Sequence, residues 1–373
     1  MPQTPLASSE ALLDELRRWV EIETPTTVAD AVNQLMDVAE AGLREAGGNV
    51  VRVPGRDGYG DNIVARTPGM GKPILVSAHL DTVWSLGTLD KMPFRVDGEK
   101  AHGPGIYDMK AGSFLAFDAV RSILRHRTPT NRPITLLLTP DEEVGSPTSR
   151  SLIETEGAEA AYVLIPEPAG PRGVCVTARK GVGRFVVEIT GKGSHAGGSF
   201  EEGASAVVEL ARQIVRIHGM VDLPAGITLN AAPVWGGSRP NVVAEAAGCE
   251  VDLRVPTAET GARMEAALLG LEPFDARCTV KVTGGMNRPP MAETPEILAL
   301  YGRARELAGQ IGLDLDKQHR GGGSDGNFTA ALGVPTLDGL GCPGAGAHAS
   351  HEHIIWTQLA PRAALITGLL ETL

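Results

Sequence analysis

The chain has 373 residues, more than one ordinary hydrophobic core holds, so two domains are expected. It is 42% hydrophobic with 46 glycines and 26 prolines, a composition that favours an α/β protein with many loops. The net charge of −11 argues against nucleic acid or an anionic membrane as a partner, and no apolar run reaches the roughly 18 residues that a membrane-spanning helix needs.

The first part of the chain alternates helices and strands. Its expected strands are nearly continuous apolar runs, which is typical of a sheet covered by helices on both faces. Helices are expected at residues 9–23, 27–47, 109–127 and 146–156, and strands at residues 50–53, 61–66, 74–78, 134–138 and 161–165.

The pattern changes near residue 177, where apolar and polar residues begin to alternate. Strands are expected there at 177–189, 227–234, 244–254 and 278–282, with helices at 203–218 and 258–270. From about residue 285 the pattern of the first part returns, in which helices alternate with apolar strands. Helices are expected at 295–309, at 326–332 and from about 357, and a strand at 336–337. The predicted fold class is therefore α/β, with one domain over 1–175 and 286–373 and a small α+β domain inserted at 176–285.

The N-terminus and the cysteines predict a cytoplasmic protein. Residues 1–20 lack a basic stretch followed by an apolar one, so no signal peptide is expected. Four cysteines (Cys175, Cys249, Cys278 and Cys342) are scattered without paired spacing, which is typical of reduced thiols and not of a zinc site.

Acidic residues and histidines recur just after apolar runs, a pattern that suggests a metal site where strands end. His79 and Asp81 follow the strand at 74–78 and share one face of it. A carboxylate two residues from a histidine can accept the second imidazole N–H and fix the tautomer that binds metal. The simpler alternative is a chance pair at a surface strand end.

Three adjacent carboxylates, Asp141, Glu142 and Glu143, follow the strand at 134–138. If they are enclosed, a cation or raised pKa values must relieve their repulsion. Neighbouring loop residues point in different directions, so one glutamate could bind metal while the other acts as a general base. A solvated acidic turn is the alternative.

Further candidate ligands follow other apolar runs. Asp108 stands where a helix is expected to begin, and it could be a helix cap, a metal ligand or both. Glu167 is held between two prolines, and His348 follows a glycine-rich loop. His351 and His353 compete with His348 by composition, although we expect them to face solvent or to lie behind the ligands.

Seven short motifs occur in the order and near the spacing of a known family. The whole chain resembles the co-catalytic zinc metallopeptidases that include glutamate carboxypeptidase, acetylornithine deacetylase and succinyl-diaminopimelate desuccinylase, and it is most similar to the glutamate carboxypeptidase branch. The motifs are SAHLDTVW (77–84), GPGIYDMKAG (103–112), TPDEEVGS (139–146), PEP (166–168), GSHAG (193–197), GGGSDG (321–326) and GAGAHASHE (344–352).

The resemblance implies a zinc-exopeptidase-like catalytic domain that binds two zinc ions, or cobalt or manganese in their place. One ion would take His79 and Glu167, the other Glu143 and His348, with Asp108 bridging the two. Glu142 would be the general base and Asp81 would orient His79. The family often has a cis peptide after the bridging aspartate, here between Asp108 and Met109.

The resemblance also implies residues in the inserted domain. His195 would stabilise the oxyanion, reaching the active site of the other subunit, although the sequence alone favours a loop histidine that caps the helix at 203–218. Substrate carboxylates would be bound by Asn241, Arg254 and Arg288, and the turn containing Gly322 and Gly323 could offer backbone N–H groups. Arg320 departs from the family, which tends to have a small polar residue there, so the preference for glutamate is open.

These features predict a metal-dependent amide hydrolase that releases a C-terminal acidic amino acid. The alternatives are an N-acyl-amino-acid deacylase or a dipeptidase of the same family, and then a binding protein on this fold that has lost catalysis. The expected partners are a small-molecule or peptide substrate with a free carboxylate and a second copy of the chain, bound through the inserted lid and dimerisation domain.

Overall fold

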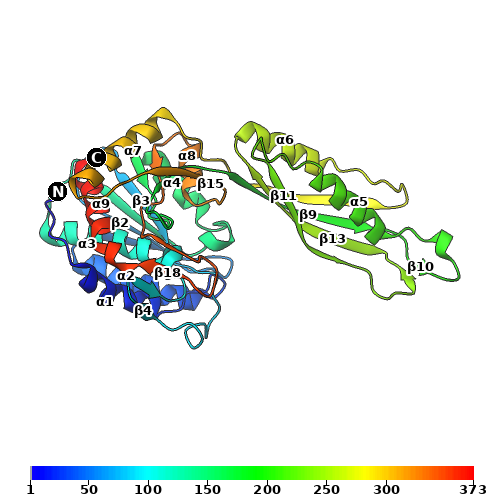
Figure 1. Cartoon of the computed structure of the whole chain (residues 1–373), viewed down its shortest axis with the longest axis horizontal. Helices are drawn as coiled ribbons and strands as arrows, with labels where there is room; N and C mark the ends of the chain where they lie inside the picture. Colours follow the sequence, from blue (N-terminus) through cyan, green and yellow to red (C-terminus); the bar gives the residue numbers. More distant parts are fainter. Residues whose placement is uncertain (1) are drawn as a thin grey trace. The chain divides into compact units, whose positions relative to one another are not determined.

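The computed structural model describes residues 2–373 and divides the chain into two units (Figure 1). The large unit comprises Met1–Ala178, Glu293–His319 and Ser324–Leu373, and the small unit comprises Arg179–Ala292 and Arg320–Gly323. The expected boundary at residues 285–286 falls inside a continuous strand, β14 (Thr279–Arg288), and the small unit extends beyond that strand.

A six-stranded mixed sheet forms the centre of the large unit, in the order β1-β2-β6-β3-β7-β16. Strands β6, β3, β7 and β16 run parallel to one another, while β1 and β2 are antiparallel to their neighbours. The strands are β1 (Asn49–Val53), β2 (Asn62–Arg66), β3 (Ile74–His79), β6 (Ile134–Thr139), β7 (Tyr162–Leu164) and β16 (Thr336–Leu337).

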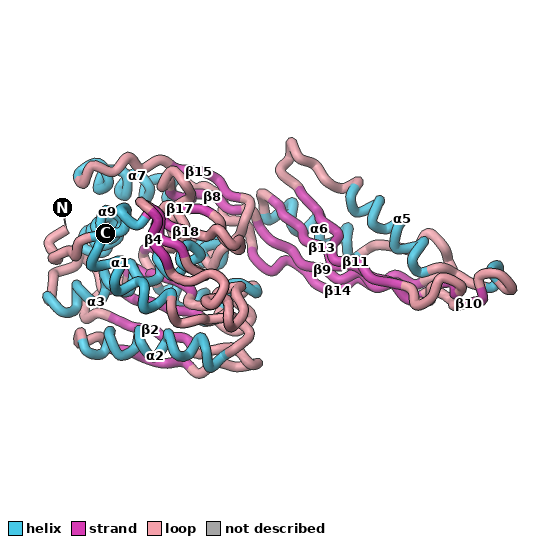
Figure 2. The backbone as a smooth tube through the Cα atoms, turned by 60° about the horizontal axis from the view of Figure 1, so that its bottom comes forward, coloured by secondary structure: helices cyan, strands magenta, loops and turns pink. Residues whose placement is uncertain are grey.

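Helices cover both faces of this sheet, because alternate strand residues point to opposite sides (Figure 2). Ile74 and Val76 pack into a core with α1, α2, α3, α7 and α9, whereas Leu75 packs into a second core with α4 and α8. The helices are α1 (Ser9–Val20), α2 (Ala29–Glu45), α3 (Ala111–His126), α4 (Arg150–Glu159), α7 (Pro295–Gln310), α8 (Gly326–Ala331) and α9 (Leu359–Thr372).

The small unit is an antiparallel sheet in the order β11-β13-β9-β14 with two helices on one face (Figure 1). Alternate residues of the strands, such as Phe185, Val187 and Ile189, form its core with the apolar sides of the two helices. The elements are β9 (Gly181–Thr190), α5 (Ala206–His218), β11 (Thr228–Gly236), β13 (Ala246–Val255), α6 (Ala258–Leu269) and β14, with a separate pair of short strands, β10 (Ser194–His195) and β12 (Val242–Val243).

The expected α/β fold class is confirmed, but several helices begin later than expected, and the backbone explains two of these shifts. The helix expected from residue 109 begins at Ala111, because Asp108 and Met109 have non-helical backbone angles. The helix expected from residue 146 begins at Arg150, because Ser146 adopts a left-handed conformation with φ of 57°.

Several short strands have no counterpart in the sequence-based expectation. They are the pair β10 and β12, the strands β4 (Arg95–Asp97), β5 (Lys100–His102), β17 (Gly344–Ala345) and β18 (His353–Ile355), which form a four-stranded sheet, and β15 (Lys317–Arg320), which pairs with β8 (Cys175–Arg179). Among residues 2–373, no helix combines the length and the apolar character needed to cross a membrane.

Candidate metal centre

The candidate ligands gather at the carboxyl ends of three neighbouring parallel strands. His79 is the last residue of β3, Glu142 and Glu143 follow β6, and Glu167 follows β7. Parallel strands present their carboxyl ends at one edge of the sheet, and open α/β sheets bind their ligands there. The fold therefore brings together residues that are far apart in the sequence.

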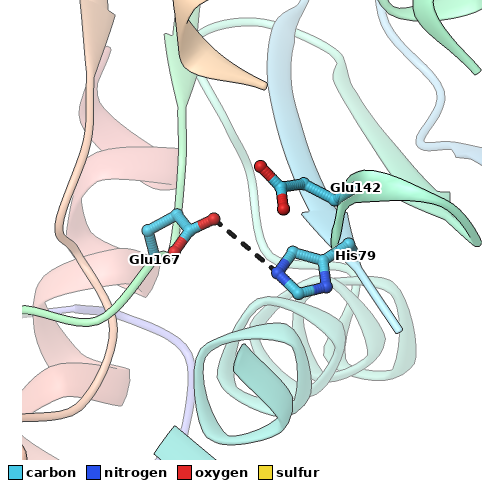
Figure 3. A group of neighbouring side chains, drawn as sticks. All are labelled: His79, Glu142 and Glu167. Carbon is cyan, nitrogen blue, oxygen red and sulfur yellow. Dashed lines mark ion pairs between the residues drawn. The ribbon is translucent and has the colours of Figure 1, made fainter. Parts of the chain in front are cut away.

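Hydrogen bonding fixes the tautomer of His79. Its Nδ1 lies 3.0 Å from the carbonyl oxygen of Asp81 and 3.3 Å from Asp81 Oδ1. Because both partners are acceptors, Nδ1 carries a proton, and Nε2 is the nitrogen that can offer a lone pair to a cation. Nε2 is buried without a hydrogen-bond partner among the described residues, and it lies 3.7 Å from Glu167 Oε1 (Figure 3).

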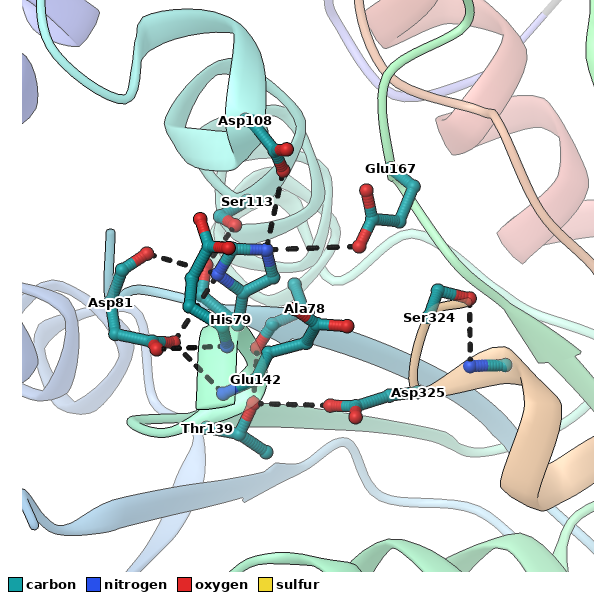
Figure 4. Close-up of polar contacts among 12 residues, drawn as sticks. Ala78, His79, Asp81, Asp108, Ser113, Thr139, Glu142, Glu167, Ser324 and Asp325 are labelled. Carbon is teal, nitrogen blue, oxygen red and sulfur yellow. Dashed lines mark hydrogen bonds and ion pairs between the residues drawn. The ribbon is translucent and has the colours of Figure 1, made fainter. Parts of the chain in front are cut away.

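Asp108 directs its two carboxylate oxygens at two different histidines. Oδ1 lies 3.6 Å from His79 Nε2, and Oδ2 lies 3.4 Å from His348 Nε2 (Figure 4 shows the His79 side). His348 Nε2 is also 3.1 Å from Glu143 Oε2. The structure thus brings together two sets of nitrogen and oxygen donors that share Asp108. The peptide bond after Asp108 is cis, as the resemblance implied.

These donor sets fit divalent cations. Two ligand atoms bound to one zinc ion at about 2.0–2.1 Å in a tetrahedron lie roughly 3.3–3.4 Å apart, close to the distances observed here. His79, Asp108 and Glu143 offer ligand atoms within 4.8 Å of one another, as do His79, Glu142 and Glu167. Among the described residues, neither the buried Nε2 of His79 nor Oε1 of Glu143 has a hydrogen-bond partner, and a bound cation would satisfy both atoms by coordination.

Asp81 connects His79 to the loop that carries both glutamates. Its carboxylate accepts the backbone N–H groups of Glu142 and Glu143, both at 3.2 Å, and the Thr26 hydroxyl at 2.7 Å. Asp81 is fully buried. One side chain therefore fixes the imidazole and the start of the loop together. No pattern in the sequence indicated Thr26, a buried threonine 55 residues upstream.

The three adjacent carboxylates point in different directions, as their loop position suggested. Asp141 turns away from the histidines and accepts the backbone N–H and hydroxyl of Thr148 at 2.6 and 2.7 Å, together with the Ser149 hydroxyl. Burial raises the pKa of Asp141, although these hydrogen bonds oppose the shift. Asp141 therefore holds the loop before α4, and the other two carboxylates face the site.

The charges at the site are strongly coupled. Burial acts to raise the pKa of Asp108, but the neighbouring His348 and His79 imidazoles outweigh it and hold the pKa well below its usual range. Burial raises the pKa of Glu143. The hydrogen bonds that His348 donates to Asp108 and Glu143 raise the pKa of His348 to about 10. Without a cation, the histidines thus supply the positive charge that balances the carboxylates.

Two buried ionisable residues beside the site were not singled out from the sequence. Lys110 donates to the Ile22 carbonyl at 2.6 Å, and burial lowers its pKa to about 7. Burial raises the pKa of Glu352 to about 7, although Glu352 accepts several N–H groups from the loop before Asp108. Glu352 is the last residue of the motif at 344–352, but the spacing of the motif does not indicate which groups its carboxylate contacts.

The remaining candidate histidines lie elsewhere. His353 belongs to β18, and its Nδ1 is 2.9 Å from the His351 carbonyl oxygen while its ring packs 5.2 Å from that of His102. His351 is exposed, as expected, and His353 is half-buried.

In the small unit, His195 and Asn241 lie beside one another. His195 pairs with Val242 between β10 and β12, and the Ala196 N–H donates to the Asn241 carbonyl at 3.0 Å. His195 Nδ1 accepts the N–H groups of Gly197 and Gly198, so the exposed ring carries its proton on Nε2. The alternative of a helix cap is wrong, because the Ser205 side chain caps α5.

The other substrate candidates surround Val182 of the central strand β9. Arg254 on β13 and Arg288 on β14 are both register partners of Val182, so all three side chains project from the same face of the sheet. Gly323 packs here too, since a Cβ atom on it would lie 2.8 Å from Arg288 Cδ. Arg254 forms two hydrogen bonds with Asp252, at 2.7 and 2.9 Å.

A second buried arginine of the small unit, Arg179, was not predicted from the sequence. Arg179 Nη1 donates to the carbonyl groups of Gly322 and Gly323, at 3.1 and 3.3 Å. These two hydrogen bonds fix the carbonyl groups of the glycine turn and so restrict its conformation.

Known proteins are similar to this chain in sequence and in fold. Residues 75–372 match the peptidase family M20/M25/M40. Carboxypeptidase G2 from Pseudomonas sp. (strain RS-16) is 32% identical over 96% of this chain and 88% of its own length. In structure, the chain is similar to aminopeptidase PepT from Bacillus cereus (TM-score 0.76, 23% identity, 98% of both chains) and to the metallo-carboxypeptidase Sso-CP2 from Sulfolobus solfataricus (TM-score 0.72, 15% identity, 96% and 98% of the two chains).

The family match covers most of the chain and confirms the resemblance drawn from the motifs. The chain belongs to the metallopeptidase family M20/M25/M40.

Proposed function

We propose that this protein is a two-metal amide hydrolase that releases an amino acid with a free carboxylate, with glutamate as the favoured product. The proposal rests on Asp108, whose two carboxylate oxygens approach different histidines. Oδ1 faces His79, and Oδ2 faces His348. His79 and Glu167 would hold one ion, Glu143 and His348 the other, and Asp108 both. Zinc is the favoured metal, with cobalt or manganese as alternatives.

A pair of divalent cations supplies Lewis-acid polarisation of a carbonyl and makes water nucleophilic at neutral pH. Glu142 is the proposed general base. Its carboxylate lies among the potential ligand atoms of His79 and Glu167, and its backbone is held by Asp81. In this role Glu142 accepts a proton from the attacking water and returns it to the leaving amine.

His195 is the proposed donor to the oxyanion of the tetrahedral intermediate, reaching the site of a partner subunit. The support comes from its tautomer, because Nδ1 already accepts two backbone N–H groups and the exposed Nε2–H is directed outward as a donor. Asn241, its neighbour in the small unit, would bind substrate with it.

Arginines of the small unit are proposed to bind the substrate carboxylates. Arg288 and Arg254 project from one face beside Gly323, and a guanidinium binds a carboxylate through two parallel hydrogen bonds. Gly322 and Gly323 would add backbone N–H groups. The cation of Arg320 in the same turn is a reason to test deacylase and dipeptidase substrates beside glutamate ones.

We also propose that the chain forms a homodimer through the small unit. Helix α5 exposes Val208 and Val215, which are 51% and 73% exposed, next to Phe274, which is 54% exposed. Strand β11 is an edge strand that exposes Val234 and Trp235. Apolar side chains exposed on a helix and on an edge strand are typical of association sites.

A substrate panel tests the proposed activity. The zinc-loaded protein is assayed for amino-acid release from folate, N-acyl-glutamate, N-acyl-aspartate, N-acetylornithine and simple dipeptides. The highest kcat/KM is expected on substrates that release glutamate. A preference for N-acetylornithine or dipeptides would replace the glutamate assignment with one of the alternatives, and no hydrolysis of any of them would contradict the proposal.

A further inference from the structure

Glu352 is a buried carboxylate whose acceptor positions are all engaged. Oε1 accepts the backbone N–H groups of Tyr107 and Asp108 at 2.9 and 3.0 Å, and Oε2 accepts that of Gly105 at 2.9 Å and the Trp84 indole N–H at 2.8 Å. The side chain is 0% exposed. Four donors therefore converge on one carboxylate from two separate segments of the chain.

These backbone donors belong to the turn that presents Asp108. Gly105 adopts a left-handed conformation with φ of 70°, and the N–H groups after it point inward as in an anion-binding nest. The turn is buried, so donors that lost Glu352 would be left without a partner, which destabilises this backbone arrangement. Glu352 therefore fixes the backbone from which the Asp108 carboxylate projects.

Glu352 also belongs to the loop that presents His348. The two residues are joined by consecutive turns, in which Ala349 N–H donates to Gly346 and Glu352 N–H donates to Ala349, both at 2.9 Å. The same side chain thus links the backbone of Asp108 to the loop of His348. The Asp108 Oδ2 to His348 Nε2 distance of 3.4 Å depends on this link.

We propose that Glu352 is a positioning residue that sets Asp108 against His348 and so determines the affinity of the metal site formed by Asp108, Glu143 and His348. The inference rests on the proposed two-metal function. The other site depends less on Glu352, because His79 is held by Asp81 and by a hydrogen bond from the Ser113 hydroxyl to its carbonyl oxygen.

Glu352→Gln tests this inference, since the amide keeps the shape but loses half of the acceptor positions. Zinc binding to the metal-free protein is measured by competition with a chelator, and amide exchange of the peptide 103–110 is measured by deuterium uptake without metal. We expect one of the two zinc affinities to fall about 10–100-fold, the other to change less than threefold, and the peptide to exchange faster. Glu352→Asp should recover part of the affinity.

Glu371→Gln is the matched control. Glu371 is also a buried carboxylate, and it accepts the N–H groups of Gln3 and Thr4 in a part of the large unit that contains no candidate ligand. This variant should bind both zinc ions as tightly as wild type even if its Tm falls.

Three outcomes would contradict the inference. Unchanged zinc affinities in Glu352→Gln would remove its positioning role, while the proposed function stood. An equal weakening of both sites, matched by Glu371→Gln, would reduce Glu352 to a general structural role. A wild-type protein that binds fewer than two zinc ions would contradict the proposed function, and the inference with it.

Discussion

At the residue scale, neighbouring carboxylates acquire different roles from what surrounds them. Asp141 is tied to Thr148 and Ser149, whereas Glu143 approaches His348 and Glu142 approaches His79 and Glu167. The backbone of both glutamates is fixed by Asp81. Chemically similar side chains can therefore divide ligand binding from proton transfer.

Glu142→Gln should separate these two roles. Removing the proposed base should lower kcat by about 10²–10⁴-fold, because proton transfer in the transition state contributes that much. Both zinc ions should remain bound, as measured by mass spectrometry under native conditions. A kcat within tenfold of wild type, with both metals present, would show that Glu142 is not the base.

Glu293 provides a pH-dependent contribution to the stability of the large unit. Hydrogen bonds from Lys317 and Thr177 lower its pKa to about 2 from an ordinary value of 4.5. A lowered pKa means that the ionised form stabilises the fold, fully above about pH 4.5 and progressively less as the pH falls toward 2. Glu293→Gln should therefore be less stable than wild type at pH 6, with a difference that shrinks at pH 3.5.

Urea unfolding at these two pH values measures the effect. The exposed Glu306 of α7, changed to glutamine, is the control and should show no such pH-dependent difference. A gap between wild type and Glu293→Gln that stays constant or widens on acidification would contradict the assignment.

At the residue scale, much of the candidate site could be predicted from the sequence. The candidate ligands directly follow apolar strands. Because parallel strands end at the same edge of a sheet, the sequence predicted that these residues lie close together. Thr26, Lys110, Arg179 and Glu352 were not found, because each acts through a backbone group or a side chain distant in the sequence. Such contacts exist only after folding.

At the element scale, close packing of backbones positions Glu167. A Cβ atom on Gly112, in the first turn of α3, would lie 1.7 Å from the Pro166 carbonyl oxygen, and one on Gly341 would lie 2.4 Å from the same atom. Gly341 N–H also donates to the Glu167 carbonyl at 2.9 Å. The segment at 166–167 is thus enclosed between two glycines.

Gly112→Ala should displace this segment. The added methyl group cannot fit beside Pro166, so we expect a lower Tm and at least a tenfold weaker zinc affinity at the site that includes Glu167. Gly302→Ala in α7 is the control, because apart from the local backbone of the helix no described atom lies within 4 Å of its Cβ position. That change should leave zinc binding intact and stabilise the protein by up to about 1 kcal/mol. Normal zinc binding in Gly112→Ala would contradict the packing argument.

Long elements were predictable and short ones were not. The central strands of the sheet and helices such as α5 have enough residues to show a period. Strands such as β17 and β18 have two or three residues, and their pairing depends on distant partners. The start of α4 was placed too early in the sequence. Thr148 and Ser149 donate hydrogen bonds to Asp141, and such contacts leave no periodic pattern in the sequence.

At the scale of the whole molecule, the chain divides its candidate residues between two units. The proposed metal ligands and Glu142 belong to the large unit, and the proposed substrate residues belong to the small unit. Composition indicated two cores, and the change of strand pattern indicated an insertion. The end of the insertion was harder to predict, because β14 runs through the point where the sequence changes character.

The proposed dimer predicts a response to charge on α5. Wild type should sediment as a dimer at micromolar concentration, and Val215→Glu should shift it toward monomer, because a carboxylate would be buried without a partner. Val38→Glu on α2 of the large unit, where the valine is 43% exposed, is the control and should leave the dimer intact. A monomeric wild type, or a dimer insensitive to Val215→Glu, would contradict the proposal.

The most direct test of the two-metal account is a zinc titration of the metal-free protein during hydrolysis of an N-acyl-glutamate. The donor sets around Asp108 predict no turnover without metal and full turnover only as the second equivalent of zinc binds, with glutamate released. Undiminished activity in rigorously metal-free protein, or full activity at one equivalent, would contradict it.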